Sequence, residues 1–190
     1  GTHALMNDDG VATMVATGGN AIVRAAYSCG KPALGVGAGN VPAYVHKEAK
    51  LKQAVNDIVL SKAFDNGMIC ASEQAAIVDK ELYDEFVKIM KSHRVHFVTK
   101  EEKAKLENLL FGVEANSENC AGAKLNSVIV GKPATEIAKL AGFEVPKGTV
   151  ILAAECSEVG VKEPLTREKL SPVLAVLKSS STKDGIEKAR

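Results

Sequence analysis

Cys70 stands in a setting that favours nucleophilic chemistry. Asn66 and Gly67 end the helical pattern before it, and the small residues Ala71 and Ser72 follow it. Small neighbours leave room for a substrate carbonyl beside the sulfur, and a loop or helix start offers backbone N–H groups that stabilise a thiolate and hold an oxyanion. Cys70 is therefore the candidate nucleophile. The alternative is a small buried side chain, which is the commonest role of an unpaired cysteine.

The other three cysteines lack a comparable setting. Cys29 lies in a helix-ending turn, Cys120 lies in the polar loop 116–122, and nothing around Cys156 suggests chemistry. No CxxC pair is present and no histidine stands at zinc-ligand spacing, so we expect no metal site and no disulfide framework. This cysteine usage favours a reducing cytoplasm. Three histidines among lysines and serines are expected at the surface: His46, His93 and His96.

Gly18 and Gly19 form a turn that could bind phosphate. They follow a predicted strand at residues 11–16 and precede a predicted helix at residues 21–27. A helix N-terminus reached through glycines presents free N–H groups and the positive end of the helix dipole to an anion. Two glycines fall short of the GxGxxG fingerprint, so a tight turn without a ligand is the alternative.

Gly35, Gly37 and Gly39 form a second glycine pattern, with a spacing of two. In an extended segment this spacing places all three on one side, where a flat ligand or another backbone can approach closely. It matches neither the dinucleotide-binding pattern nor the P-loop pattern. Close packing between two elements is as well supported as a ligand site.

Strands and helices alternate along the chain, which predicts an α/β fold with a mainly parallel sheet. A further helix begins at Ser181 or Thr182, and the chain stops at Arg190 after about two turns of it, so we expect a fragment of a longer protein. The patterns predict strands at residues 11–16, 41–45, 75–78, 127–130, 150–153 and 173–177, and helices at residues 21–27, 50–64, 80–92, 101–111 and 133–141.

The charge balance excludes some classes of protein. The chain has 24 Lys and Arg against 23 Asp and Glu, a formal net charge of +1. A nucleic-acid-binding protein would need a surplus of basic residues to neutralise phosphates. No apolar run approaches the roughly 18 residues of a membrane-spanning helix, and no secretory signal opens the chain. We expect neither a nucleic acid nor a membrane as a partner.

Three motifs together resemble the aldehyde dehydrogenase superfamily. Residues 66–74 (NGMICASEQ) resemble its nucleophile loop, Thr17-Gly18-Gly19 resembles its pyrophosphate-binding turn, and residues 168–173 (EKLSPV) resemble its Glu-x-Phe-Gly-Pro segment. The motifs occur in the family's order, and the resemblance covers essentially the whole chain. It is closest to the CoA-acylating acetaldehyde dehydrogenases, in particular to the aldehyde dehydrogenase half of the bifunctional aldehyde-alcohol dehydrogenases.

The resemblance implies an aldehyde dehydrogenase-like α/β fold. Residues 1–42 would be the rear part of a Rossmann-like NAD-binding domain, and residues 43–190 would be the catalytic domain with a parallel-rich sheet. Cys70 would add to acetaldehyde as a thiohemiacetal, NAD would accept the hydride, and coenzyme A would release the thioester as acetyl-CoA, all reversibly. The resemblance also implies a cytoplasmic homo-oligomer that acts on small molecules.

The same resemblance assigns the cofactor contacts. Gly18 and Gly19 would lie under the pyrophosphate, Glu168 would bind the ribose hydroxyls of the nicotinamide half, and Gly37 and Leu170 would line the nicotinamide pocket. From the local pattern alone, by contrast, Glu168 is a charged surface residue.

Two positions depart from the family pattern. Val36 stands where the hydrolytic members carry a Glu, and Leu170 replaces the aromatic residue of the Pro-containing segment. The first half of the cofactor domain, which in the family supplies a side-chain amide for the oxyanion, lies outside this sequence. Two other classes also fit the residues: a nucleotide-binding module in which Cys70 belongs to the core, and an assembly subunit whose surface strands build filaments.

Overall fold

A two-stranded and a five-stranded parallel sheet organise the chain. The structure is a computed structural model that describes residues 1–113 and 122–190, and Cys120 with most of its loop lies outside these described residues. The two sheets belong to two compact units, Gly1–Gly39 and Asn40–Arg190. Val41 and Pro42, which the sequence analysis places with the first domain, pair with Glu73 and Ala75 in the larger sheet.

The smaller unit is a βαβ element preceded by a short helix. Parallel strands β1 and β2 pair from Met14↔Ala33 to Thr17↔Val36. One face of this sheet packs on helix α2, where Ala16 and Ala26 are buried. The other face exposes Val15, Leu34 and Val36. The elements are α1 (Thr2–Asn7), β1 (Met14–Thr17), α2 (Asn20–Ser28) and β2 (Ala33–Val36).

The larger unit is built on five parallel strands in the order β3-β4-β7-β6-β5. Its strands are β3 (Val41–Val45), β4 (Glu73–Asp79), β5 (Val95–Phe97), β6 (Ile151–Cys156) and β7 (Val173–Ser179). Its helices are α3 (Leu51–Ala63), α4 (Tyr83–Ser92), α5 (Lys100–Phe111), α6 (Ala134–Ala141) and α7 (Thr182–Ala189), with 3₁₀ turns η1 (Phe64–Gly67), η2 (Ser127–Ile129) and η3 (Pro164–Thr166).

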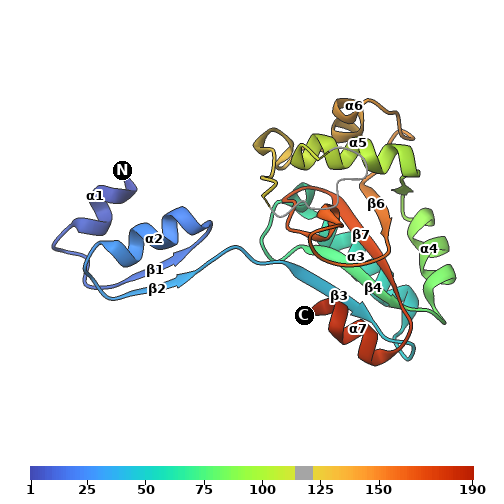
Figure 1. Ribbon diagram of the computed structural model, residues 1–190, viewed down its shortest axis with the longest axis horizontal. Coiled ribbons are helices and arrows are strands. Elements are labelled where there is room, and N and C mark those ends of the chain that lie inside the picture. The colour runs from blue at the N-terminus through green and yellow to red at the C-terminus, as the bar shows by residue number, and fades with distance from the viewer. Residues whose placement is uncertain (114–121) are drawn as a thin grey trace. The chain divides into compact units, whose positions relative to one another are not determined.

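Helices cover both faces of the five-stranded sheet (Figure 1). The alternation of side chains along β4 shows the two layers, because Ala76 and Val78 pack with residues of α3 and α4, whereas Ala75 and Ile77 pack with residues of α5 and α6. The central strands are buried on both sides, which explains their continuous apolar sequences. The predicted α/β fold with a parallel sheet is confirmed.

The structure differs from the sequence-based expectations at several places. Residues 127–130 do not form a strand: Ser127–Ile129 is a 3₁₀ turn, because the side chain of Asn126 accepts a hydrogen bond from the backbone N–H of Val128 at 3.0 Å and caps the turn. Strands β2 and β5 were not predicted. His96, which was expected at the surface, lies in β5 with its side chain 23% exposed and 3.2 Å from the carboxylate of Glu102.

Candidate active site

The loop that carries Cys70 and the segment that carries Glu168 meet at one edge of the larger sheet. Cys70 lies just before β4, and Glu168 lies just before β7. These strands are parallel neighbours, paired from Ala75↔Ala175 onward. The two incoming segments therefore meet at the amino edge of the sheet.

The Cys70 thiol is exposed at the surface of a tight loop. Helix α3 ends at Ala63, and the chain then turns through Asp65 and Asn66, which have positive φ angles of 47° and 50°. Asn66 tolerates this left-handed backbone better than most side chains do. Beyond the cysteine, the N–H of Ser72 donates to the carbonyl of Ile69 at 2.9 Å, which closes the turn around Cys70. An accessible thiol held in a closed turn satisfies the first requirement of a nucleophile.

Close backbone packing fixes the Cys70 loop against the Glu168 segment. A Cβ atom on Gly67 would lie 2.6 Å from the carbonyl oxygen of Ser171, and the φ of Gly67 is +66°. The side chain of Asn66 donates to the carbonyl of Gly131 at 2.9 Å, and the N–H of Gly131 donates to the carbonyl of Leu170 at 3.1 Å. Only glycine fits at position 67, so this residue sets the separation of the two segments.

Replacing Gly67 by alanine should lower the free energy of unfolding by about 3 kcal/mol, because strain at positive φ adds to a clash with backbone that has little room to move. Gly112→Ala is the matched control: its φ is +64°, but no atom of residues 1–113 and 122–190 lies within 4 Å of the added Cβ. It should cost only about 1 kcal/mol. Urea unfolding of both variants measures the difference, and equal losses would contradict a close contact at Gly67.

Three buried polar residues lie behind the Cys70 loop, and the sequence analysis missed all of them. Lys62, Gln74 and Lys169 are each at most 1% exposed. The Nζ of Lys169 donates to the carbonyls of Gln74, Leu165 and Arg167 at 2.9, 2.6 and 2.8 Å. The Oε1 of Gln74 accepts from the backbone N–H of Lys169 at 3.1 Å and from the Nζ of Lys62 at 3.3 Å. Gln74 thus joins helix α3 to the Glu168 segment.

Glu168 is half-buried, and no other described side chain is hydrogen-bonded to its carboxylate. Burial raises the pKa of Glu168, while the ammonium groups of Lys169 and Lys62 act in the opposite direction. Leu170 follows in a left-handed conformation with a φ of 46°. The structure thus brings Cys70, Glu168 and Leu170 together through their segments at the amino edge of the sheet.

The remaining predicted contacts lie in the smaller unit. Gly18 and Gly19 join β1 to α2, and the N–H of Gly18 donates to the carbonyl of Val36 at 3.1 Å. Gly19 caps α2 without a side-chain hydrogen bond, so the helix N-terminus is open to an anion. Gly37 follows β2, and a Cβ on it would lie 3.6 Å from Oδ1 of Asn20. Gly18, Gly19 and Gly37 therefore gather at the carboxyl ends of β1 and β2.

Gly35, in contrast, serves packing. It lies within β2, and a Cβ atom on it would come within 2.6 Å of Val23 and 2.7 Å of Tyr27, both on helix α2. The hydroxyl of Tyr27 also accepts from the N–H of Gly35 at 2.9 Å. One of the two interpretations of this glycine pattern was the close approach of another element. That approach is observed at Gly35, the first glycine of the pattern.

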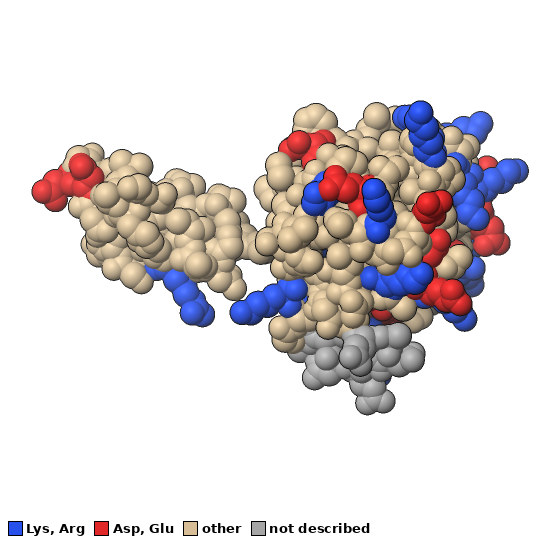
Figure 2. Space-filling view, turned by 90° about the horizontal axis from the view of Figure 1, so that it is seen from above, with Lys and Arg blue, Asp and Glu red and all other residues tan. Residues whose placement is uncertain are grey.

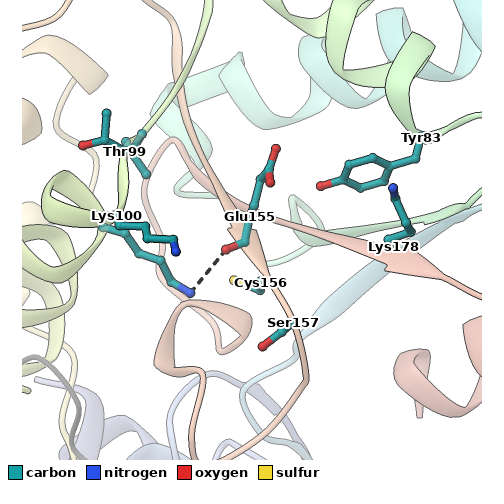
Figure 3. Close-up of a pocket in the computed structure, with 9 residues that line it drawn as sticks. Tyr83, Thr99, Lys100, Glu155, Cys156, Ser157 and Lys178 are labelled. Carbon is teal, nitrogen blue, oxygen red and sulfur yellow. Dashed lines mark hydrogen bonds between the residues drawn. The ribbon is translucent and has the colours of Figure 1, made fainter.

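A cavity of about 400 Å³ opens at the opposite, carboxyl edge of the larger sheet (Figure 3). Lys103 lies there, 2.6 Å from the carboxylate of Glu163 and 3.2 Å from the carbonyl oxygen of Glu155. Burial raises the pKa of the Cys156 thiol to about 12, so this sulfur stays protonated at neutral pH. The cavity does not supply a second nucleophile.

Three further features of the described residues concern surface charge, metal ligands and membrane-spanning helices. On the visible face of the larger unit, Lys and Arg side chains are interspersed with Asp and Glu (Figure 2). Within residues 1–113 and 122–190, no group of three or more His, Cys, Asp or Glu side chains could hold a metal ion. No helix in these ranges is long and apolar enough to cross a membrane.

A parallel α/β fold with an exposed cysteine close to a carboxylate-bearing segment is an arrangement suited to thiol chemistry. The aldehyde dehydrogenase family matches residues 2–189. The chain belongs to this family.

One curated relative and two solved structures illustrate which members of the family this chain is similar to. The aldehyde-alcohol dehydrogenase of Streptococcus pneumoniae is 73% identical over 189 residues, which cover all of this chain and 21% of that protein. An acetylating aldehyde dehydrogenase from Geobacillus thermoglucosidasius has a TM-score of 0.88 and 42% identity, over 99% of this chain and 40% of its own. A propionaldehyde dehydrogenase of Rhodopseudomonas palustris, solved with bound CoA and an acylated cysteine, has a TM-score of 0.83 and 28% identity, over 99% and 41%.

Proposed function

We propose that this chain is the nucleophile-bearing part of a longer CoA-acylating acetaldehyde dehydrogenase, called here the full-length enzyme. The chain spans about a fifth of its curated relative from Streptococcus pneumoniae. The observation that carries the proposal is the exposed thiol of Cys70 in a turn fixed against the Glu168 segment. The proposal keeps the domain roles that the family resemblance implies: residues 1–42 contribute to NAD binding, and residues 43–190 hold the nucleophile. The proposal includes a cytoplasmic homo-oligomer.

Cys70 performs the covalent chemistry in this proposal. Its thiolate attacks the carbonyl carbon of acetaldehyde, so a C–S bond forms and the carbonyl π electrons move to the oxygen as an alkoxide. The alkoxide takes up a proton from water to give the thiohemiacetal. The thiohemiacetal becomes an acetyl thioester on Cys70 when its carbon loses a hydride, for which bound NAD would be the acceptor, and its hydroxyl loses a proton to water. The thiolate of coenzyme A then attacks the thioester carbonyl, and the Cys70 thiolate leaves with its electron pair. The acylated cysteine and bound CoA of the Rhodopseudomonas palustris relative support this sequence of steps.

The residues present fit a nicotinamide dinucleotide. The N-terminus of α2, where the N-cap Gly19 provides no side-chain hydrogen bond, offers N–H donors suited to a pyrophosphate. No described side chain donates a hydrogen bond to the Glu168 carboxylate, which would accept hydrogen bonds from the ribose hydroxyls. As the family resemblance implies, Gly37 and Leu170 would line the nicotinamide pocket. When bound, NAD supplies the hydride acceptor. The chain's part is to bind and orient it.

Glu168→Gln tests this cofactor role in the full-length enzyme. The substitution keeps an acceptor oxygen and loses the charge-assisted bond to the ribose, a loss of roughly 1–3 kcal/mol in the hydride-transfer step. The rate of NAD reduction should fall accordingly, whereas iodoacetamide should alkylate Cys70 at its normal rate. Unchanged cofactor kinetics would return Glu168 to the status of a surface residue.

The overall proposal is tested by following NADH formation from acetaldehyde with coenzyme A, with NAD and NADP in parallel assays. We expect acetyl-CoA as the product and a preference for NAD. A full-length enzyme that makes no acetyl-CoA with either cofactor would refute the proposed activity. Activity with NADP alone would overturn only the choice of NAD.

A further inference from the structure

Lys62 is a buried titratable group that the mechanism above leaves unused. It lies in the last turn of α3 and is 0% exposed. An ammonium has three N–H donors, and the hydrogen bond observed here is the one to Oε1 of Gln74 at 3.3 Å. Isolated buried charges are unfavourable by several kcal/mol. A lysine in this position therefore needs an explanation beyond packing.

The charged groups that act on Lys62 come from two elements. The carboxylates of Glu73 on β4 and Glu168 on the segment before β7 attract its charge. Lys169, on the same segment, repels it and is also influenced by Cys156 on β6. Lys169 differs from Lys62, because its three N–H donors already have three carbonyl acceptors. The ammonium of Lys62 donates to one acceptor, Oε1 of Gln74, and the carboxylates of Glu73 and Glu168 act on its charge through space.

Buried polar atoms without a hydrogen-bond partner also lie near Lys62, on the segments that carry Cys70 and Glu168. Among the described residues, three buried side-chain oxygens have no hydrogen-bond partner: Ser72 Oγ, Glu73 Oε2 and Ser171 Oγ. All three lie on the two segments that carry Cys70 and Glu168. The interior between these segments thus holds buried side-chain oxygens without a hydrogen-bond partner, close to the ammonium groups of Lys62 and Lys169.

We propose that Lys62 is a positioning residue: through Gln74 its ammonium ties the Glu168 segment to the loop that carries Cys70, and together with Lys169 it provides the positive charge that keeps the Glu168 carboxylate ionised. The inference rests on the proposed role of Glu168 in binding the ribose. A neutral carboxylic acid would lose the charge-assisted hydrogen bonds to the hydroxyls. Lys62 thereby acts on the cofactor through Glu168 and touches no reacting atom.

The sign of the pH effect follows from the groups involved. Burial lowers the pKa of Lys62 to about 7, so its charge is present in acidic solution, where a carboxyl of raised pKa titrates. That charge favours the ionised form of Glu168. Removing it should raise the pKa of Glu168 further, so that the carboxyl takes up its proton at higher pH and cofactor affinity falls earlier on acidification.

The test is NADH affinity, measured by fluorescence titration of the full-length enzyme between about pH 5 and 8. In Lys62→Met the midpoint of the acidic loss of affinity should move up by about one pH unit. Lys52→Met is the matched control, because it removes the same charge from an exposed position of α3, and its profile should equal that of the unchanged enzyme. If Lys62→Met does not fold, Lys62→Gln carries the same prediction with a donor retained for Gln74.

A double-variant cycle separates this inference from the proposed function. With Glu168→Gln in place, adding Lys62→Met should produce no further shift, because the carboxyl through which Lys62 acts is gone. A shift that persists in that background, or an unchanged midpoint in Lys62→Met alone, would overturn the role of Lys62. If Glu168→Gln by itself leaves NADH affinity and its pH profile unchanged, the proposed role of Glu168 fails as well.

Discussion

Cys70→Ser should reduce the rate of acetyl-CoA formation by the full-length enzyme on the order of a thousandfold or more. A hydroxyl is nearly isosteric with a thiol but far less acidic, so it does not provide an anionic nucleophile at neutral pH. The exposed position of Cys70 makes the substitution structurally mild. Steady-state assays with acetaldehyde, NAD and coenzyme A measure the loss.

Cys29→Ser is the matched control for this experiment. Its thiol is only partly exposed and donates to the carbonyl of Ala26 at 2.9 Å, a bond that a serine hydroxyl retains. Its rate should equal that of the unchanged enzyme, and both variants should melt near the unchanged temperature. If Cys70→Ser kept more than a tenth of the original rate, Cys70 would not be the nucleophile.

The second large effect concerns which nucleophile releases the acyl group. Water needs a nearby base to attack a thioester at neutral pH, and Val36 offers none where hydrolytic members of the family carry a Glu. The thiol of coenzyme A ionises near pH 8 to 9 like other thiols, so a usable fraction is already thiolate. Turnover should therefore require coenzyme A. Without it we expect at most a single burst of NADH, and sustained production of free acetate at a comparable rate would refute the idea.

Val36→Glu provides the reverse experiment. Val36 is 58% exposed at the end of β2, so a carboxylate is tolerated there without disturbing the core. If the site admits water, the added base should increase acetate formation without coenzyme A by roughly 10²-fold or more, the usual contribution of a general base. Val36→Gln, which has a similar size and no basic carboxylate, should show no increase.

Helical periodicity made much of the larger unit predictable. Val55 and Val59 mark the buried stripe of α3, and the same spacing brings position 62 onto that stripe. The burial of Lys62 was nevertheless not predicted, because lysines are almost always exposed unless they are paired. The position of Lys62 on the helix was the signal that could have found it. Its partner Gln74 is joined to Lys169, 95 residues further along the chain, only in the folded sheet.

Short elements and site geometry were harder to predict. β5 has only three residues, Val95–Phe97, too few to show a period, and it forms because Val95 pairs with Ile151 of β6. Residues 66–74 and 168–173 were recognised as motifs, but their contact depends on β4 and β7 being neighbours. That order follows from long-range pairing between strands, which no local pattern encodes.

The most direct test of the account is to look for the acyl-enzyme itself. The full-length enzyme is incubated with acetyl-CoA in the absence of NADH, then digested under acidic conditions and mapped by mass spectrometry. The account predicts an acetyl group on the peptide that contains Cys70, and its removal when free coenzyme A is added before digestion. An active enzyme whose Cys70 peptide stays unmodified, or whose acetyl group lies on Cys29 or Cys156 instead, would contradict it.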